Sequence, residues 1–140
     1  MNYLEGRAAY LGGPIEYDTG EDWRSPVKKV LSERFKLCVF DPSLDPKQNQ
    51  IADLRRMRQE GNYDQLSEVA HEFVRADLGI IDNATFLIAY LPYKVPVFGT
   101  VHEIVSANDA KKPTLLVCPE GKDKITTWAF GFIRHEFMFG

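Results

Sequence analysis

The sequence has little of what builds disulfide scaffolds or membrane spans. Its 140 residues include two cysteines, Cys38 and Cys118, with no CxxC or histidine spacing around them. Both lie in or beside apolar, strand-like runs, so we expect buried free thiols rather than a disulfide framework. No apolar run approaches the roughly 20 residues that cross a bilayer, and the first residues lack the basic-then-apolar pattern of a signal peptide. The sequence therefore predicts a cytoplasmic protein with no membrane partner.

An excess of charge and the common cofactor motifs are also lacking. The 17 basic and 20 acidic residues give a net charge of −3, which favours no nucleic-acid partner. There is no G-x-G-x-x-G motif, no Walker-type phosphate loop and no G-x-S-x-G elbow. The histidines, His71, His102 and His135, have no metal-ligand spacing, so we expect surface or helix-packing roles for them. The sequence predicts neither a metal nor a cofactor.

Short apolar runs alternating with amphipathic segments are what the sequence does contain. The apolar runs, which predict strands, cover residues 8–11, 37–40, 86–91 and 114–117. Apolar residues at helical spacing predict helices over residues 25–35, 51–58, 66–77 and 101–108, with Ser25 capping the first and a turn at Asp82-Asn83 after the third. Strands that are apolar on both faces indicate a parallel sheet covered on both sides. We expect one α/β domain over residues 1–140, with a Rossmann/flavodoxin-like sheet and helices on both faces.

Polar and glycine residues gather after the predicted strands. Tyr10 and the Gly12-Gly13 loop end the first strand, Asp41 follows the second, and Glu103 comes after the third. Because the carboxyl ends of parallel strands meet at one edge of a sheet, where open α/β folds bind ligands, these residues should share one crevice. The sequence therefore predicts a small-ligand pocket at this edge.

Thr100-x-x-Glu103 at the start of the last predicted helix has two interpretations. Threonine followed three residues later by glutamate is a capping box, in which both side chains satisfy the unpaired N–H groups of a helix start. Alternatively, Glu103 in the first turn is a catalytic carboxylate, kept ionised by the helix dipole. Spacing alone leaves both interpretations open.

Carboxylates and aromatic rings are the remaining chemistry of this crevice. The carboxylates are Asp77, Asp82 and Glu103, and the rings include those of Tyr10 and Trp23. Paired carboxylates suit reactions at an anomeric carbon, one as nucleophile and one moving a proton at the leaving group. Aromatic rings suit a planar leaving group such as a nucleobase. Structural roles stay open too: Tyr10 in the core, Asp77 at a helix end and Trp23 in packing.

Four motifs resemble the nucleoside 2-deoxyribosyltransferase family. They occur in that family's order between about Tyr10 and Pro119: Tyr10-Leu11-Gly12-Gly13-Pro14, Asp22-Trp23-Arg24, Ala76-Asp77-Leu78 and Gly99-Thr100-Val101-His102-Glu103-Ile104. The resemblance implies that Glu103 is a nucleophile that holds deoxyribose as a covalent glycosyl-enzyme. It also implies that Tyr10 orients Glu103 and that Asp77 contacts the base and helps to protonate it. The predicted substrate-binding residues are Gly12, Gly13, Trp23, Asp82, Gly99 and Thr100.

The implied activity is transfer of a 2-deoxyribosyl group between nucleobases, with a nucleoside or nucleotide and a free base as partners. One position departs from the family, whose members often carry an aspartate six residues before the nucleophile, where this chain has Val97. Two alternatives stay open: an N-glycosidase acting on a nucleoside or nucleoside monophosphate, and a non-catalytic nucleotide-binding module. A nucleotide hydrolase needs a phosphate contact. The candidates are Ser25 with Lys28, Lys29 or the arginines of residues 55–58. Those arginines have the alternative interpretation of a solvated helix face.

The C-terminal segment, residues 125–140, is rich in large aromatics. They are Trp128, Phe130, Phe132, Phe137 and Phe139. Five such side chains in sixteen residues are difficult to bury within a small monomer, so the sequence predicts a homo-oligomer.

Overall fold

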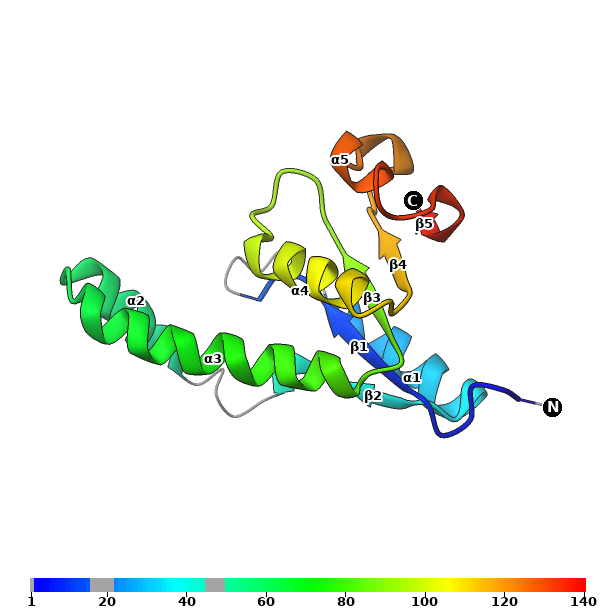
Figure 1. Cartoon of the computed structure of the whole chain (residues 1–140), viewed down its shortest axis with the longest axis horizontal. Coiled ribbons are helices and arrows are strands. Elements are labelled where there is room, and N and C mark those ends of the chain that lie inside the picture. The colour runs from blue at the N-terminus through cyan, green and yellow to red at the C-terminus, as the bar shows by residue number, and fades with distance from the viewer. Residues whose placement is uncertain (1, 16–21, 45–49) are drawn as a thin grey trace.

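Five parallel strands form the centre of the computed structural model, which describes residues 2–15, 22–44 and 50–140. The strands are β1 (Ala8–Gly12), β2 (Cys38–Phe40), β3 (Phe86–Tyr90), β4 (Thr114–Val117) and β5 (Met138–Phe139). They lie in the order β2-β1-β3-β4-β5 (Figure 1). The predicted parallel sheet and its first four strands are confirmed. The fifth strand was not predicted and pairs Met138 with Leu116 at one edge.

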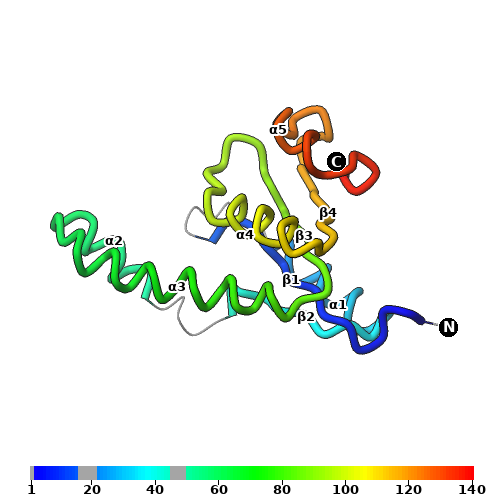
Figure 2. Tube along the Cα trace, viewed as in Figure 1, coloured from blue at the N-terminus to red at the C-terminus, as the bar shows by residue number. Residues whose placement is uncertain are grey.

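Helices cover both faces of this sheet, as the sequence predicted. They are α1 (Arg24–Phe35), α2 (Ile51–Gln59), α3 (Tyr63–Asn83), α4 (Phe98–Asp109) and α5 (Thr127–Phe130), with short 3₁₀ turns η1 (Pro42–Leu44), η3 (Lys122–Lys124) and η4 (His135–Phe137). Helices α3 and α4 pack together on one face, while α1 covers the other (Figure 1). Figure 2 shows that α2 folds back along α3 and that this hairpin extends beyond the sheet.

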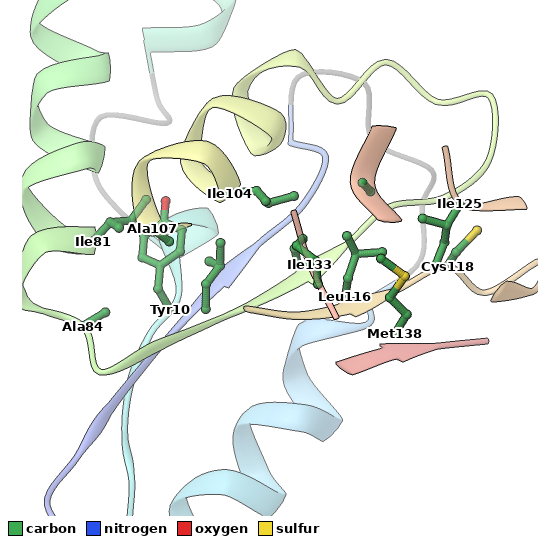
Figure 3. Close-up of a cluster of buried hydrophobic side chains, with 13 residues drawn as sticks. Tyr10, Ile81, Ala84, Ile104, Ala107, Leu116, Cys118, Ile125, Ile133 and Met138 are labelled. Atoms are coloured by element: carbon green, nitrogen blue, oxygen red, sulfur yellow. The ribbon is translucent and has the colours of Figure 1, made fainter. Parts of the chain in front are cut away.

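The core lies between the sheet and the α3–α4 layer. Tyr10, Leu87, Ala89 and Leu116 point from three neighbouring strands into one buried cluster with Ile104 of α4. Figure 3 shows Tyr10 at one end of this cluster and Cys118 with Met138 at the other. The alternation of side chains along each strand places these residues on one face and their sequence neighbours on the α1 face.

Helix α3 is longer than the sequence predicted. The turn expected at Asp82-Asn83 is absent, and the helix runs without interruption to Asn83. Ile81, only 2% exposed, belongs to the core cluster, so burial of its side chain favours continuing the helix. The Nζ atom of Lys112 then donates hydrogen bonds to the carbonyls of Ile81, Asp82 and Ala84.

Two local predictions were also wrong. Helix α1 begins at Arg24 rather than after a Ser25 cap, and the Asp22 carboxylate accepts the Ser25 N–H at 3.1 Å. Cys38 is exposed, because it lies on β2, the strand at the edge of the sheet. Cys118 is buried as predicted.

Lys112 closes the end of α3 and provides a stability test. We expect Lys112→Met to lower the free energy of unfolding by about 2 kcal/mol, since hydrogen bonds to a charged group are worth about 1.5–3 kcal/mol each and carbonyls at a helix end need partners. Urea titration followed by circular dichroism measures this change. Lys29→Met, at an exposed position of α1, is the matched control, and an equal loss in that variant would contradict the role of Lys112.

Most of the C-terminal aromatics remain at the surface. Trp128 is 84% exposed, and Phe130, Phe137 and Phe139 are 40–46% exposed. Self-association stays a prediction, to which this uncovered apolar surface adds support. Across the ranges that the structure describes, no helix has both the length and the apolar character that a bilayer span requires.

Candidate active site

A cavity of about 310 Å³ opens at the carboxyl edge of the sheet, on the α3–α4 face. The chain order reverses between β1 and β3, and this switch point is where open parallel sheets leave a crevice for a ligand. The volume suits a small organic molecule. Its lining includes Gly13, Asp77, Gly99, Thr100 and Glu103 from the predicted site.

Tyr10, Asp77 and Glu103 come together at this cavity. Asp77 lies on α3 and Glu103 on α4, and both carboxylates line the cavity. Tyr10 is fully buried in β1 beneath them and does not line the cavity itself. Three elements distant in sequence therefore supply one cluster, as the sequence predicted for these residues.

The electrostatics of the cluster keep Tyr10 neutral. Burial raises the pKa of Tyr10 well above its ordinary value, and the negative charges of Glu103 and Asp77 raise it further. The Arg24 guanidinium acts in the opposite direction but does not reverse the effect. A protonated phenol can donate a hydrogen bond toward a carboxylate, so Tyr10 is suited to orient Glu103.

The capping-box interpretation of Thr100 and Glu103 is wrong. Helix α4 starts at Phe98 after Val97, and no side chain caps it. Thr100 is the third residue of the helix and is 3% exposed, while Glu103 lies in the second turn instead of the predicted first. The effect of a helix dipole fades beyond the first turn. The dipole therefore stabilises the ionised form of Glu103 less than the sequence suggested. Both side chains instead face the cavity.

Gly12 and Gly13 face opposite sides of the sheet. A Cβ atom on Gly12 would lie 3.6 Å from Glu103 Oε2 and 3.6 Å from Thr100 Cγ2. One on Gly13 would lie 3.0 Å from the Trp23 ring. Strand alternation therefore places Gly12 under the cavity and Trp23 on the α1 face.

Three predicted binding residues are not in the lining of the cavity: Gly12, which lies directly under it, and Trp23 and Asp82, which lie away from it. Trp23 stacks on Tyr90 with ring centroids 4.9 Å apart and is not among the lining residues, so its packing role is the one observed. Asp82 is exposed near the end of α3, before β3 begins, and thus lies toward the opposite edge of the sheet. Asp41, predicted to share the crevice, instead forms ion pairs with Arg24 and Lys28 of α1.

The outer wall of the cavity was not predicted. It is an apolar surface from the α2–α3 hairpin, formed by Ile51, Leu54, Leu66, Ala70, Phe73, Val74 and Leu78. The helical spacing of these residues was the available signal, but it indicates only an apolar face and not what that face covers. Along α3, the cavity lining from Leu66 to Asp77 spans about 16 Å, at 1.5 Å per residue.

Among the residues that the structure describes, the basic side chains in the cavity lining are Arg58 of α2 and His102 of α4, both of them exposed. His102 was predicted to be a surface or packing residue, and Arg58 was one of several phosphate-contact candidates. Of the other candidates, Lys28 pairs with Asp41 on the α1 face. Arg56 forms an exposed ion pair with Asp53.

Nothing in the described ranges gathers three or more histidine, cysteine, aspartate or glutamate side chains into a cluster that could hold a metal ion. No protein-family model matches the chain, and no curated protein matches it.

Proposed function

We propose that this protein is a nucleoside 2-deoxyribosyltransferase-like enzyme that exchanges nucleobases on deoxyribose through a covalent intermediate on Glu103. The observation that carries the proposal is the convergence of Glu103 and Asp77 on one cavity above the buried Tyr10. Two carboxylates at one cavity suit chemistry at an anomeric carbon. The motif resemblance and the apolar, Phe73-containing wall support a nucleoside as the substrate.

The proposed reaction has two displacements. In the first, a Glu103 carboxylate oxygen attacks C1′ of the deoxyribose, and the bond from C1′ to the base nitrogen breaks with its electron pair leaving on the base. Asp77, in its protonated form, gives its proton to the departing base and is left as a carboxylate. In the second, a nitrogen of another base attacks C1′, the bond to Glu103 breaks, and Asp77 recovers a proton from the incoming base. Tyr10 holds Glu103 in line for both steps.

An exchange assay tests this proposal. The protein is incubated with a deoxynucleoside, with and without a second free base, and the products are followed by chromatography. Formation of the new nucleoside only when the second base is present is the expected result. Release of free base without an acceptor would instead support hydrolysis. Failure to turn over any nucleoside or nucleotide would refute both enzymatic proposals and leave a non-catalytic nucleotide-binding module.

Hydrolysis of a nucleoside monophosphate is the second candidate, and Arg58 favours it. Arg58 of α2 lines the same cavity as the two carboxylates. A guanidinium in that lining can form paired hydrogen bonds with a phosphate group of a substrate. Val97, which lines the cavity where the family often has aspartate, offers no hydrogen bond to a sugar hydroxyl. Running the assay with a nucleoside and with its monophosphate separates the two candidates.

A further inference from the structure

Arg24 is a buried cation on the face of the sheet opposite the cavity. It is 7% exposed at the start of α1. Its Nε atom donates to the carbonyl of Leu11 at 3.4 Å, and Nη2 donates to the carbonyl of Gly13 at 3.1 Å. A buried charge is costly unless its donors are satisfied, so these bonds hold the guanidinium and the two carbonyls together. The two carbonyls flank Gly12 on either side.

The guanidinium is also fixed from its other sides. Asp41 Oδ1 lies 3.7 Å from Arg24 Nε, and the same carboxylate pairs with Lys28 at 3.0 Å. Although burial by itself would raise the pKa of Asp41, hydrogen bonds from Ser43 and Lys28 keep it below its ordinary value, so the carboxylate stays charged. The guanidinium carbon lies 4.8 Å from the centre of the Trp23 ring, and that ring stacks on Tyr90. Such a contact adds cation–π attraction and limits rotation of the guanidinium.

Glu103 rests on the other side of the same short segment. Its Oε2 atom would lie 3.6 Å from a Cβ atom on Gly12, so the Gly12 backbone forms the floor beneath the carboxylate. A Cβ atom on Gly13, next in the chain, would meet Trp23 and Arg24 on the α1 face. Glu103 therefore lies on the cavity side of Gly12, and Arg24 is hydrogen-bonded to the carbonyls of Leu11 and Gly13.

We propose that Arg24 is a positioning residue for Glu103: by holding the carbonyls of Leu11 and Gly13, it fixes the Gly12 floor on which the Glu103 carboxylate lies. The role rests on the proposed function of Glu103 as nucleophile. A misplacement of about 1 Å in a reacting group can lower a rate about 100-fold. Arg24 itself does not line the cavity, so the route proposed from Arg24 to Glu103 is the backbone that it holds.

Arg24→Ala tests the proposal, with Arg34→Ala as its matched control. Arg34 lies on the same helix, is exposed, and has its guanidinium over the neighbouring Phe35 ring. We expect kcat per folded molecule to fall about 10- to 100-fold in Arg24→Ala with KM changed by less than about threefold, and no change in Arg34→Ala. Millimolar guanidinium should restore part of the kcat of Arg24→Ala, and methylammonium should not. An unchanged kcat, or a loss that guanidinium does not relieve, would overturn the proposal.

A structural readout separates this proposal from the function of the site. If the wild-type protein turns over no nucleoside, the proposed function fails, but nuclear magnetic resonance still tests Arg24. The amide signals of Gly12 and Gly13 and the side-chain carboxyl signal of Glu103 should shift in Arg24→Ala and return toward their wild-type positions with guanidinium. They should stay in place in Arg34→Ala. A Glu103 signal that does not move in folded Arg24→Ala would overturn the positioning role.

Discussion

Glu103→Ala is expected to lower turnover at least about a thousandfold, because it removes the atom that bonds to C1′. Glu103 faces the cavity, with Tyr10 and the Gly12 backbone beneath it. Base release in a single-turnover chromatographic assay measures the loss. Intact wild-type protein trapped with substrate should also gain the mass of one deoxyribosyl unit, on the peptide that contains Glu103.

The same variant should remain folded. Glu103 is only partly buried. Its charge raises the pKa of the fully buried Tyr10, so its carboxylate interacts with a desolvated polar group and does not pack in the apolar core. Groups placed for catalysis often reduce stability, and their removal is frequently neutral or stabilising. We therefore expect the variant to unfold in urea in a cooperative transition, as the wild type does.

A control and a contradicting outcome complete this test. Glu72→Gln changes a carboxylate on α3 whose side chain is 74% exposed and which pairs with Arg75 at the surface. It should leave turnover unchanged. Turnover retained in Glu103→Ala would refute the assignment of Glu103 as nucleophile and would leave Asp77 as the other carboxylate among the described residues that line the cavity.

The strands and the edge that carries the site were predictable because burial on both faces leaves an unambiguous pattern. Residues 86–91 and 114–117 are continuous apolar runs of strand length, and such runs read as parallel strands covered on both sides. Right-handed connections then place the following loops on one edge. Tyr10 and Glu103 could thus be assigned to the same crevice although they are far apart in sequence.

Helix ends were not predictable, because tertiary contacts decide them. Gly79 and Asp82-Asn83 look like turn residues, yet burial of Ile81 and the three carbonyl contacts of Lys112 keep α3 helical to Asn83. Gly99 suggests a loop, but α4 already begins at Phe98. At the end of α3, distant groups outweigh local propensity.

The faces on which side chains lie explain which site residues were predicted wrongly. Asp82 follows Asp77 by five residues, which on a helix is a rotation of about 140° away from the cavity. Trp23 is near the Gly-Gly loop, but it meets Gly13 on the α1 face, whereas Glu103 meets Gly12 on the other. A motif shows which residues are close in the sequence. The face of the sheet on which each side chain lies depends on the register of the strand.

Asp77→Asn is the second large expected effect. If Asp77 protonates the departing base, the amide should lower kcat/KM by about 100- to 1,000-fold for ordinary nucleosides, within the range of general acid catalysis. The substitution keeps the shape of a half-buried side chain that lines the cavity. Initial rates over a range of pH, compared with the wild type, measure the loss, and the limb of the wild-type profile that reports the acid should disappear in the variant.

The dependence on the leaving group distinguishes proton transfer from a purely structural role. A nucleoside whose base leaves without a proton should be cleaved by Asp77→Asn at nearly the wild-type rate, since no acid is needed. Asp82→Asn is the control on the same helix: its side chain is exposed and outside the lining of the cavity, so both kinds of substrate should react at wild-type rates. An equal loss for both leaving groups in Asp77→Asn would mean that Asp77 binds the substrate or holds the cavity in shape. The proton would then have to reach the base by another route, for which His102, on the same cavity, is the titratable group to test next.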